Sequence, residues 1–246
     1  MNSTKRSHKQ NVDSLEVLIT QVRTFEPVFN PSETRLTITN QEQIKSKGDQ
    51  VLTGVISAET ASNNAISART AAFDNFDGLI TRVIGALRIS DVPEQTITQA
   101  ESIVRELRHK RASEIVPPVV TEEGKGDGAQ TRRNKLHTGS MNTKIENFGK
   151  LIMLLSTLPA YKPNETDLTI AALGAKLEAL KQANTVCITA DAAADAARKQ
   201  RNMLLYTDKT GLVDIALDSK QYVKSAYGAT SPQYKSVRSI LFTKIK

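Results

Sequence analysis

The residues best placed to do chemistry lie near the end of the chain, where cations and tyrosines alternate. Residues 219–246 contain six basic residues and no acidic one. Cations with interleaved aromatic rings are typical of surfaces that bind nucleic acid or another polyanion, because cations meet phosphates and rings stack on bases. A solvated helix face, with the tyrosines at the edge of a core, is the alternative interpretation. The candidate contacts are Lys220, Tyr222, Lys224, Tyr227, Tyr234, Lys235, Arg238, Lys244 and Lys246.

Two arginines form the second candidate site. Arg69 and Arg201 each continue the apolar series of a long predicted helix. A guanidinium in such a place needs carboxylate or carbonyl partners, because an unpaired buried charge is costly. Glu33 and Glu165 are the expected partners, at the far end of each half or across a pseudo-twofold axis. These four residues predict structural ion pairs that set the register of the helices, or alternatively an anion site.

The remaining reactive groups form no pattern that is typical of catalysis. The three histidines, His8, His109 and His137, fall in the N-terminal tail, at a helix end and between the two halves. Cys187 is the only cysteine, so no intrachain disulfide can form, and its alanine-rich surroundings predict a small buried side chain rather than a nucleophile. Paired metal-ligand spacings and a phosphate-binding glycine loop are missing. We therefore expect no enzyme, no cofactor and no metal site.

The strongest pattern along the chain is a repeated signature, Pro-x-Glu-Thr-x-Leu-Thr-Ile. Residues 29–38 align with residues 161–170 at an offset of 132 positions, and six of the ten residues are identical. At the same offset Arg69 aligns with Arg201. So long a period excludes solenoid repeats of roughly 20–50 residues and indicates a duplicated subdomain.

Each half has the pattern of about four helices. In each half the Pro-x-Glu-Thr signature leads into a long helix. The apolar or small residues at 3-4 spacing in these helices extend from Ile44 to Phe76 and from Leu173 to Leu204, which predicts a seam between close-packed helices. With only 4% aromatic residues, the core is expected to consist of Ala, Leu, Ile and Val. The shorter helices are expected at 12–24, 79–89 and 94–110 in the first half, and at 143–158, 212–227 and 233–240 in the second.

These elements predict an all-α fold, an internally duplicated bundle of long antiparallel helices with two similar halves of about four helices each. A polar, glycine-rich segment separates the halves. The expected organisation is a disordered basic tail at 1–10, a first helical repeat at 11–111, a flexible linker or long loop at 112–142, and a second helical repeat with a basic C-terminus at 143–246.

The second half also resembles a known group of proteins. Residues 210–218 and 220–235, with the Arg201-Asn202 pair before Leu204, are similar to the C-terminal signature of uncharacterised helical-bundle proteins from Bacteroidetes-type bacteria. The resemblance covers mainly residues 159–243, and the first half departs from it. It implies an all-helical bundle and implies no activity, substrate or cofactor.

Charge and hydropathy limit the function. Residues 1–115 contain 14 basic and 14 acidic residues, whereas residues 140–246 contain 15 and 9, so the second half is the expected contact surface for an acidic partner. No apolar run approaches the roughly 18–20 residues that span a bilayer. We expect a non-enzymatic cytoplasmic scaffold protein that self-associates into a homo-oligomer, a filament or another polymer. The alternatives are a helical protein that binds nucleic acid or another polyanion, and an amphipathic pore-former.

Overall fold

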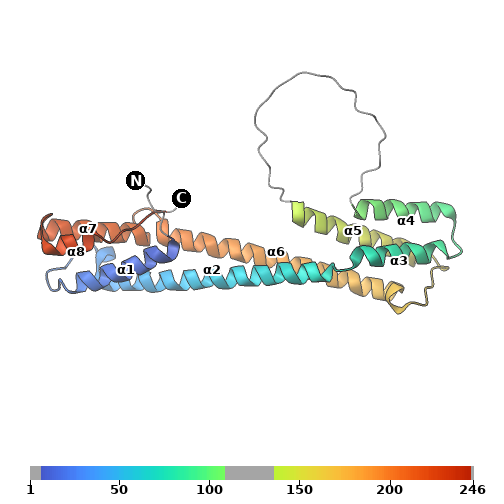
Figure 1. Cartoon of the computed structure of the whole chain (residues 1–246), viewed down its shortest axis with the longest axis horizontal. Coiled ribbons are helices and arrows are strands. Elements are labelled where there is room, and N and C mark those ends of the chain that lie inside the picture. The colour runs from blue at the N-terminus through green and yellow to red at the C-terminus, as the bar shows by residue number, and fades with distance from the viewer. Residues whose placement is uncertain (1–6, 109–135, 245–246) are drawn as a thin grey trace, which may run out of the picture. The chain divides into compact units, whose positions relative to one another are not determined.

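The computed structural model describes residues 7–108 and 136–244, and every regular element in these ranges is helical (Figure 1). The prediction of an all-helical bundle is therefore confirmed. No helix in the described ranges is long and apolar enough to cross a membrane. In chain order the elements are α1 (His8–Arg23), the 3-10 helix η1 (Thr34–Leu36), α2 (Ile38–Ala72), α3 (Phe76–Arg88), α4 (Glu94–Leu107), α5 (Leu136–Ser156), the 3-10 helix η2 (Thr166–Leu168), α6 (Ile170–Tyr206), α7 (Leu212–Tyr227) and α8 (Pro232–Arg238).

Helices α1 and α5 begin one turn or more earlier than the sequence predicts. The hydroxyl of Ser7 accepts a hydrogen bond from the backbone N–H of Gln10, and the Gln10 side chain accepts one from the Ser7 N–H. This capping box starts α1 at His8, so the predicted disorder at 1–10 is wrong for residues 8–10, while residues 1–6 lie outside the described residues. Helix α5 includes residues 136–142, so the predicted linker is wrong there too, and 112–135 lie outside the described residues.

The described chain forms two compact units, and each unit takes helices from both halves of the sequence. Unit 1 contains residues 7–63 and 190–244, and unit 2 contains residues 64–108 and 136–189. The division falls inside α2 and α6. The predicted domains at 11–111 and 143–246 are therefore not the compact units, because the halves bury their apolar surfaces on each other.

The core of unit 1 joins α1 of the first half to α7 and α8 of the second. In α1 the buried residues recur at helical spacing, and Leu15 and Leu18 are fully buried. They pack in one cluster with Leu212 of α7 and Val237 of α8. Burying a side chain of this size contributes about 1.5–3 kcal/mol, so contacts between the halves contribute to the stability of this unit.

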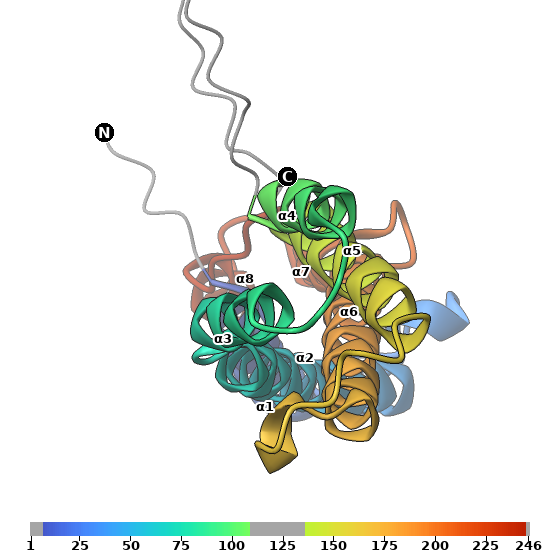
Figure 2. The same cartoon turned by 90° about the vertical axis from the view of Figure 1, so that its right-hand side faces the viewer.

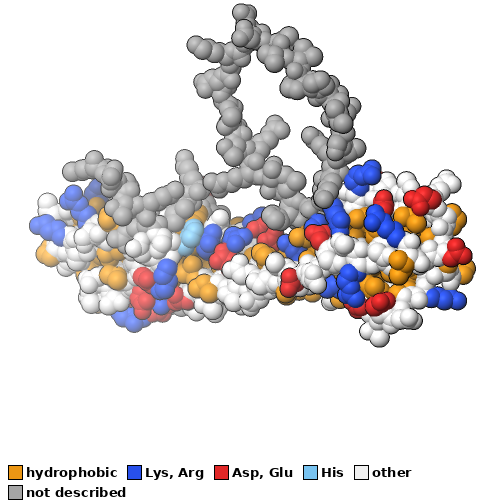
Figure 3. All heavy atoms as spheres, turned by 45° about the vertical axis from the view of Figure 1, so that its right-hand side comes forward, with side chains coloured by type: hydrophobic (Ala, Val, Ile, Leu, Met, Phe, Trp, Pro, Cys, Tyr) orange, Lys and Arg blue, Asp and Glu red, His pale blue; other side chains and the backbone are white. Residues whose placement is uncertain are grey.

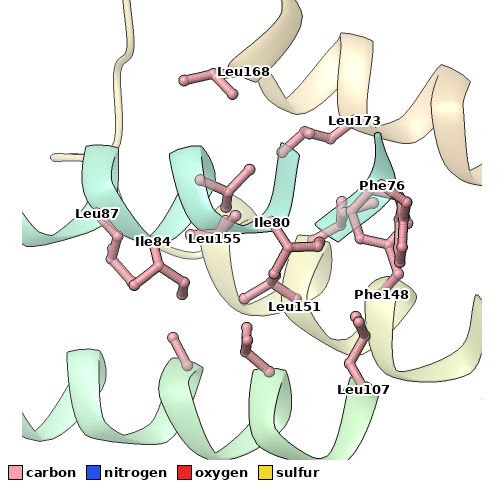
Figure 4. Close-up of a cluster of buried hydrophobic side chains, with 14 of the residues drawn as sticks. Phe76, Ile80, Ile84, Leu87, Leu107, Phe148, Leu151, Leu155, Leu168 and Leu173 are labelled. Carbon is pink, nitrogen blue, oxygen red and sulfur yellow. The ribbon is translucent and has the colours of Figure 1, made fainter. Parts of the chain in front are cut away.

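The core of unit 2 joins α3 and α4 of the first half to α5 and the start of α6 (Figure 4). Phe76 of α3 and Phe148 of α5 meet edge to face, with ring centroids 5.0 Å apart. Figure 4 shows Leu107 of α4 and Leu151 of α5 in the same cluster, and Figure 2 shows α4 lying along α5. Again the buried surface lies mostly between elements of different halves.

A narrow stripe of residues, small in its middle part, is buried along both long helices. Val55, Ser62 and Arg69 follow one another at intervals of seven, which is the spacing of a coiled-coil seam. Cys187 is only 3% exposed, which confirms the prediction of a small buried side chain. Every predicted seam position is buried or half-buried: Ile44, Gly48, Val51, Val55, Ala58, Ser62, Ala65, Arg69, Ala72 and Phe76, then Leu173, Leu177, Leu180, Ala183, Cys187, Ala190, Ala194, Ala197, Arg201 and Leu204.

Candidate functional site

The tyrosines of the basic C-terminal segment pack against the core of unit 1. The ring of Tyr222 meets that of Phe29 edge to face, with centroids 5.2 Å apart. The hydroxyl of Tyr227 donates to the carbonyl of Phe25 at 3.0 Å. Tyr234 is half-buried, and the Lys224 ammonium lies 5.9 Å from its ring centre, within cation–π range. These rings are used inside the fold, so they present little surface on which a base could stack.

Two of the candidate cations are also used inside unit 1. Lys220 donates to the backbone carbonyls of Arg238 at 3.2 Å and Ile240 at 2.7 Å, and burial lowers the pKa of its ammonium. Lys244 forms an ion pair with Asp214 at 2.8 Å. The same contact is the reason that the pKa of Lys244 is raised. Both lysines fasten the C-terminal segment to α7.

Of the remaining candidate cations, Lys224 is half-buried beside Tyr234 and two others face solvent. Lys235 and Arg238 are exposed on α8, three positions apart, and neither has an ion-pair partner among the described residues. Lys246 lies outside the described residues. The structure therefore reduces the predicted polyanion surface to Lys224, Lys235 and Arg238.

The two seam arginines have partners other than the predicted glutamates. Arg69 is 9% exposed and donates to the side-chain oxygen of Asn184 at 3.3 Å. Arg201 donates twice to Asn202, its neighbour in sequence, at 3.1 and 2.9 Å. Glu33 lies 3.8 Å from Arg35. The expected pairs are replaced by amide contacts, because asparagine side chains reach the seam from the same or the adjacent helix.

Glu33 and Glu165 contribute through their backbone carbonyls. Glu33 O accepts from the N–H of Leu36 at 2.9 Å, and Glu165 O accepts from that of Leu168 at 3.0 Å. These bonds close η1 and η2 and turn both leucines into the cores, where they are 6% and 3% exposed. The side chain of Glu33 itself remains 68% exposed.

The signature threonines cap the long helices. Thr37 Oγ1 accepts from the N–H of Asn40 at 3.4 Å, and Thr169 Oγ1 accepts from that of Ala172 at 3.3 Å. Each thus satisfies a free N–H at the start of its helix. Tyr161 adds a bond to the second turn, donating to Leu168 O at 3.0 Å, and its burial raises the pKa of the phenol to about 12. The signature therefore encodes one local structure, a 3-10 turn followed by a capped helix.

An ion pair fastens each signature turn to a helix of the other half. In unit 1 Arg35 donates to Asp218 of α7 at 2.6 Å. In unit 2 Arg82 of α3 donates through two nitrogens to Asp167, at 2.5 and 3.0 Å. The Arg82 guanidinium lowers the pKa of the Asp167 carboxyl. Sequence reasoning missed both pairs, because each joins residues more than 80 positions apart.

A second feature that the sequence did not reveal is a hollow of about 460 Å³ between α3 and α4. Ile84 and Val104 supply apolar walls, while Arg88 and Arg105 supply guanidinium groups. Arg88 is paired with Glu101, and Arg105 has no ion-pair partner among the described residues. Figure 3 shows basic, acidic and hydrophobic side chains intermixed on its right-hand part, to which these helices belong. Such walls suit a ligand with an apolar body and an anionic group.

Within the described ranges, no group of three or more His, Cys, Asp or Glu side chains is arranged to hold a metal ion. The structure thus offers contact surfaces and ion pairs as candidate functional features. No protein-family model matches this chain, and comparisons with curated proteins and with solved structures gave no significant match.

Proposed function

We propose that this protein is a non-enzymatic scaffold protein that self-associates by pairing one half of a chain with the complementary half of another. The observation that carries the proposal is the composition of the compact units. Each unit buries helices of the first half against helices of the second. A surface that is complementary to the other half of its own chain is equally complementary to that half in a second copy.

Internal duplication is part of the proposal, and the order of the elements supports it. Helices α1, α2, α3 and α4 with η1 are followed by α5, α6, α7 and α8 with η2 in the same order. Both 3-10 helices fall on the repeated signature. The buried apolar residues of α1 recur in α5 at an offset of 133 positions: Val12, Leu15, Leu18, Ile19 and Val22 correspond to Ile145, Phe148, Leu151, Ile152 and Leu155.

An antiparallel arrangement of α2 and α6 belongs to the same proposal, and contacts within unit 2 support it. Arg69 donates to Asn184, and three residues later the carbonyl of Ala72 accepts from Lys176 at 2.8 Å. As the position in α2 rises, the position of its partner in α6 falls. This is the order expected when the two helices run in opposite directions.

Pairing between unlike halves has two outcomes at high protein concentration. Exchange between two chains closes a dimer, whereas exchange that passes from chain to chain gives an open polymer. Both use the apolar cores already described, so no additional interface is needed. The proposed assembly is thus a domain exchange, in which the buried surface is the same within a chain and between chains.

Sedimentation velocity and negative-stain microscopy test the proposal, after the protein has been refolded over a range of concentrations. We expect particles at multiples of 26.9 kDa, and the fraction of larger particles should rise with the concentration during refolding. A protein that is strictly monomeric at every concentration would contradict the proposal.

A cross-linked variant is the matched control. Glu59 and Arg198 form an ion pair at 2.9 Å within unit 1, and both side chains are 41% exposed. In a chain that carries Glu59→Cys, Arg198→Cys and Cys187→Ala, a short bis-maleimide added at low concentration joins the two halves of one molecule. Such a chain cannot exchange halves, so we expect it to stay monomeric. Larger particles from the cross-linked chain would show that association uses another surface.

Binding of a polyanion is the second candidate function, and one observation favours it. Lys235 and Arg238 lie exposed in the last turn of α8, without a carboxylate partner among the described residues. A gel mobility shift with single-stranded nucleic acid tests it. The shift should weaken steeply with salt and disappear in Lys235→Glu/Arg238→Glu. No shift at low salt would exclude this function.

A further inference from the structure

The two signature turns carry opposite charges at equivalent positions. Arg35 occupies the variable position of the first signature, and Asp167 occupies the same position of the second, 132 residues later. Their partners are reversed as well. Arg35 pairs with Asp218 of α7, and Asp167 pairs with Arg82 of α3. Each pair therefore joins a turn of one half to a helix of the other half, with the signs exchanged.

The reversal matters when one half meets a second copy of itself. At the repeat offset of 132, Asp218 aligns with Ala86 and Arg82 aligns with Asp214, so the two partner positions lie about one helical turn apart. If two first halves paired, Arg35 of one would lie within about one turn of Arg82 of the other. If two second halves paired, Asp167 would lie within about one turn of Asp218. We propose that the reversed ion pairs form a pairing code, by which each half accepts the unlike half and rejects a copy of itself. The inference rests on the internal duplication proposed above, and it does not require the intact chain to self-associate.

Such a code suits ion pairs at this level of exposure. The side chains of Arg35 and Asp218 are 35% and 44% exposed, and those of Arg82 and Asp167 are each 51% exposed. Exposed pairs add little to stability. Selection, however, depends on the difference between attraction and repulsion, and a symmetrical pair of like halves contains the repulsive contact twice. The apolar cores supply the stability, while the charges choose between partners with similar apolar surfaces.

Pairing of two second halves can be detected by cross-linking. Asp191 is the residue that aligns with Glu59 in the repeat, and Glu59 contacts Arg198 in the native structure. In a pair of second halves, Asp191 of one chain would therefore lie beside Arg198 of the other. Two full-length chains are made in a Cys187→Ala background, one with Asp191→Cys and the other with Arg198→Cys. They are unfolded, mixed, refolded and treated with a short bis-maleimide.

Three forms of this mixture distinguish a pairing code from a simple structural role. With native charges we expect little cross-linked product. The variant Arg82→Asp/Asp167→Arg keeps an opposite pair in unit 2 but turns the repulsive contacts between like halves into attractive ones. We expect roughly ten times more product, since two contacts change sign. Adding Arg35→Asp/Asp218→Arg to the same chain restores repulsion between like halves, and the product should return to the native amount.

A purely structural role predicts that all three mixtures give the same amount of product, and this result would overturn the proposal. The difference should also shrink as salt is raised, because exposed charges are screened. The variant Arg35→Asp/Asp218→Arg alone should likewise give about ten times more product than the native charges. It reverses the ion pair of unit 1, and it replaces Arg82→Asp/Asp167→Arg if that chain does not fold. Each chain treated separately gives the background. When two chains associate through unlike halves, the two introduced cysteines do not come together. This test therefore gives a separate answer from the test of self-association.

Discussion

The side chain of Asn11 in α1 forms two hydrogen bonds with the backbone of Thr243, near the end of the described chain. Asn11 Nδ2 donates to the Thr243 carbonyl at 2.8 Å, and Asn11 Oδ1 accepts from the Thr243 N–H at 3.0 Å. Asn11 is completely buried, and its Nδ2 also lies 3.3 Å from the hydroxyl of Tyr206. One asparagine thus connects three segments of unit 1.

Replacement of this residue, Asn11→Ala, is expected to destabilise the protein by about 1–3 kcal/mol, because it leaves backbone groups of Thr243 without partners. Urea unfolding measures the change. Asn64→Ala is the control, because Asn64 is an exposed residue within α2, and its effect should stay within about 0.5 kcal/mol. Equal effects of the two substitutions would show that the contacts with Thr243 contribute nothing.

Stability should depend on pH through His8. Burial, together with the positive charge of Arg201, lowers the pKa of His8, and its Nδ1 lies 2.7 Å from the hydroxyl of Tyr206. The unfolded chain therefore binds this proton more tightly. The contribution of His8 to the free energy of unfolding is complete above about pH 6.5 and is lost as the pH falls from there through the folded pKa.

Urea unfolding of the native protein and of His8→Asn, from about pH 8 down to about pH 5, isolates this contribution. Asparagine keeps an acceptor for Tyr206 but does not titrate in this range. The difference between the two stabilities should shrink as the pH falls, with a slope of at most about 1.4 kcal/mol per pH unit, the limit for one proton. A difference that does not vary with pH would contradict the assignment.

Two glycines of α2 test the packing of α1 and α7 on this helix. A methyl group at Gly54 would meet no atom within 4 Å, so Gly54→Ala should stabilise the protein by about 0.5–1 kcal/mol through helix propensity. At Gly48 the same methyl would lie 3.1 Å from Val12 and 3.3 Å from Leu212. Gly48→Ala should therefore be the less stable of the two variants. Thermal unfolding ranks the stabilities of the two variants. The reverse order would show that α1 can move to make room for the methyl group.

The local structure could be predicted from the sequence, because its causes lie within a few residues. The 3-4 spacing located α2 and α6, and all of the predicted seam positions are buried or half-buried. The signature threonines, Thr37 and Thr169, each stand directly before a long helix and accept from the N–H three residues ahead. The start of α1 was missed, because Ser7 and Gln10 cap it through side chains that follow no apolar spacing.

The partners of the charged residues could not be predicted, since they depend on which segments meet. Lys220 and Lys244 resemble free cations in sequence, but the fold brings one to backbone carbonyls and the other to Asp214. For the same reason the ion pair between Arg82 and Asp167 has no local signal. These contacts form because helices of the first half pack against helices of the second. Hydrophobic periodicity cannot reveal this packing, since the pattern is the same whichever half supplies the partner helix.

Small residues at the seam set how closely the long helices approach. Ala194 is fully buried in α6, whereas Ala192, two positions earlier, is exposed. Ala194→Leu should destabilise the protein by about 1–3 kcal/mol, because the added atoms must separate packed helices. Ala192→Leu changes the same residue type on the solvent side and should have an effect within about 0.5 kcal/mol. Urea unfolding of both variants provides the comparison, and similar values would argue against a close-packed seam.

Because each core joins helices of both halves, the two halves should stay associated after the chain is cut between them. A protease recognition sequence inserted within residues 112–135 allows the chain to be divided between α4 and α5 after it has folded. The two fragments should remain together on gel filtration, since the core of unit 1 joins α1 to α7 and the core of unit 2 joins α4 to α5. They should separate only in denaturant, because those cores must open first. If the halves were independent domains, each with its own core, cleavage would release two separate fragments in native buffer. The uncut chain, run on the same column, gives the reference elution volume.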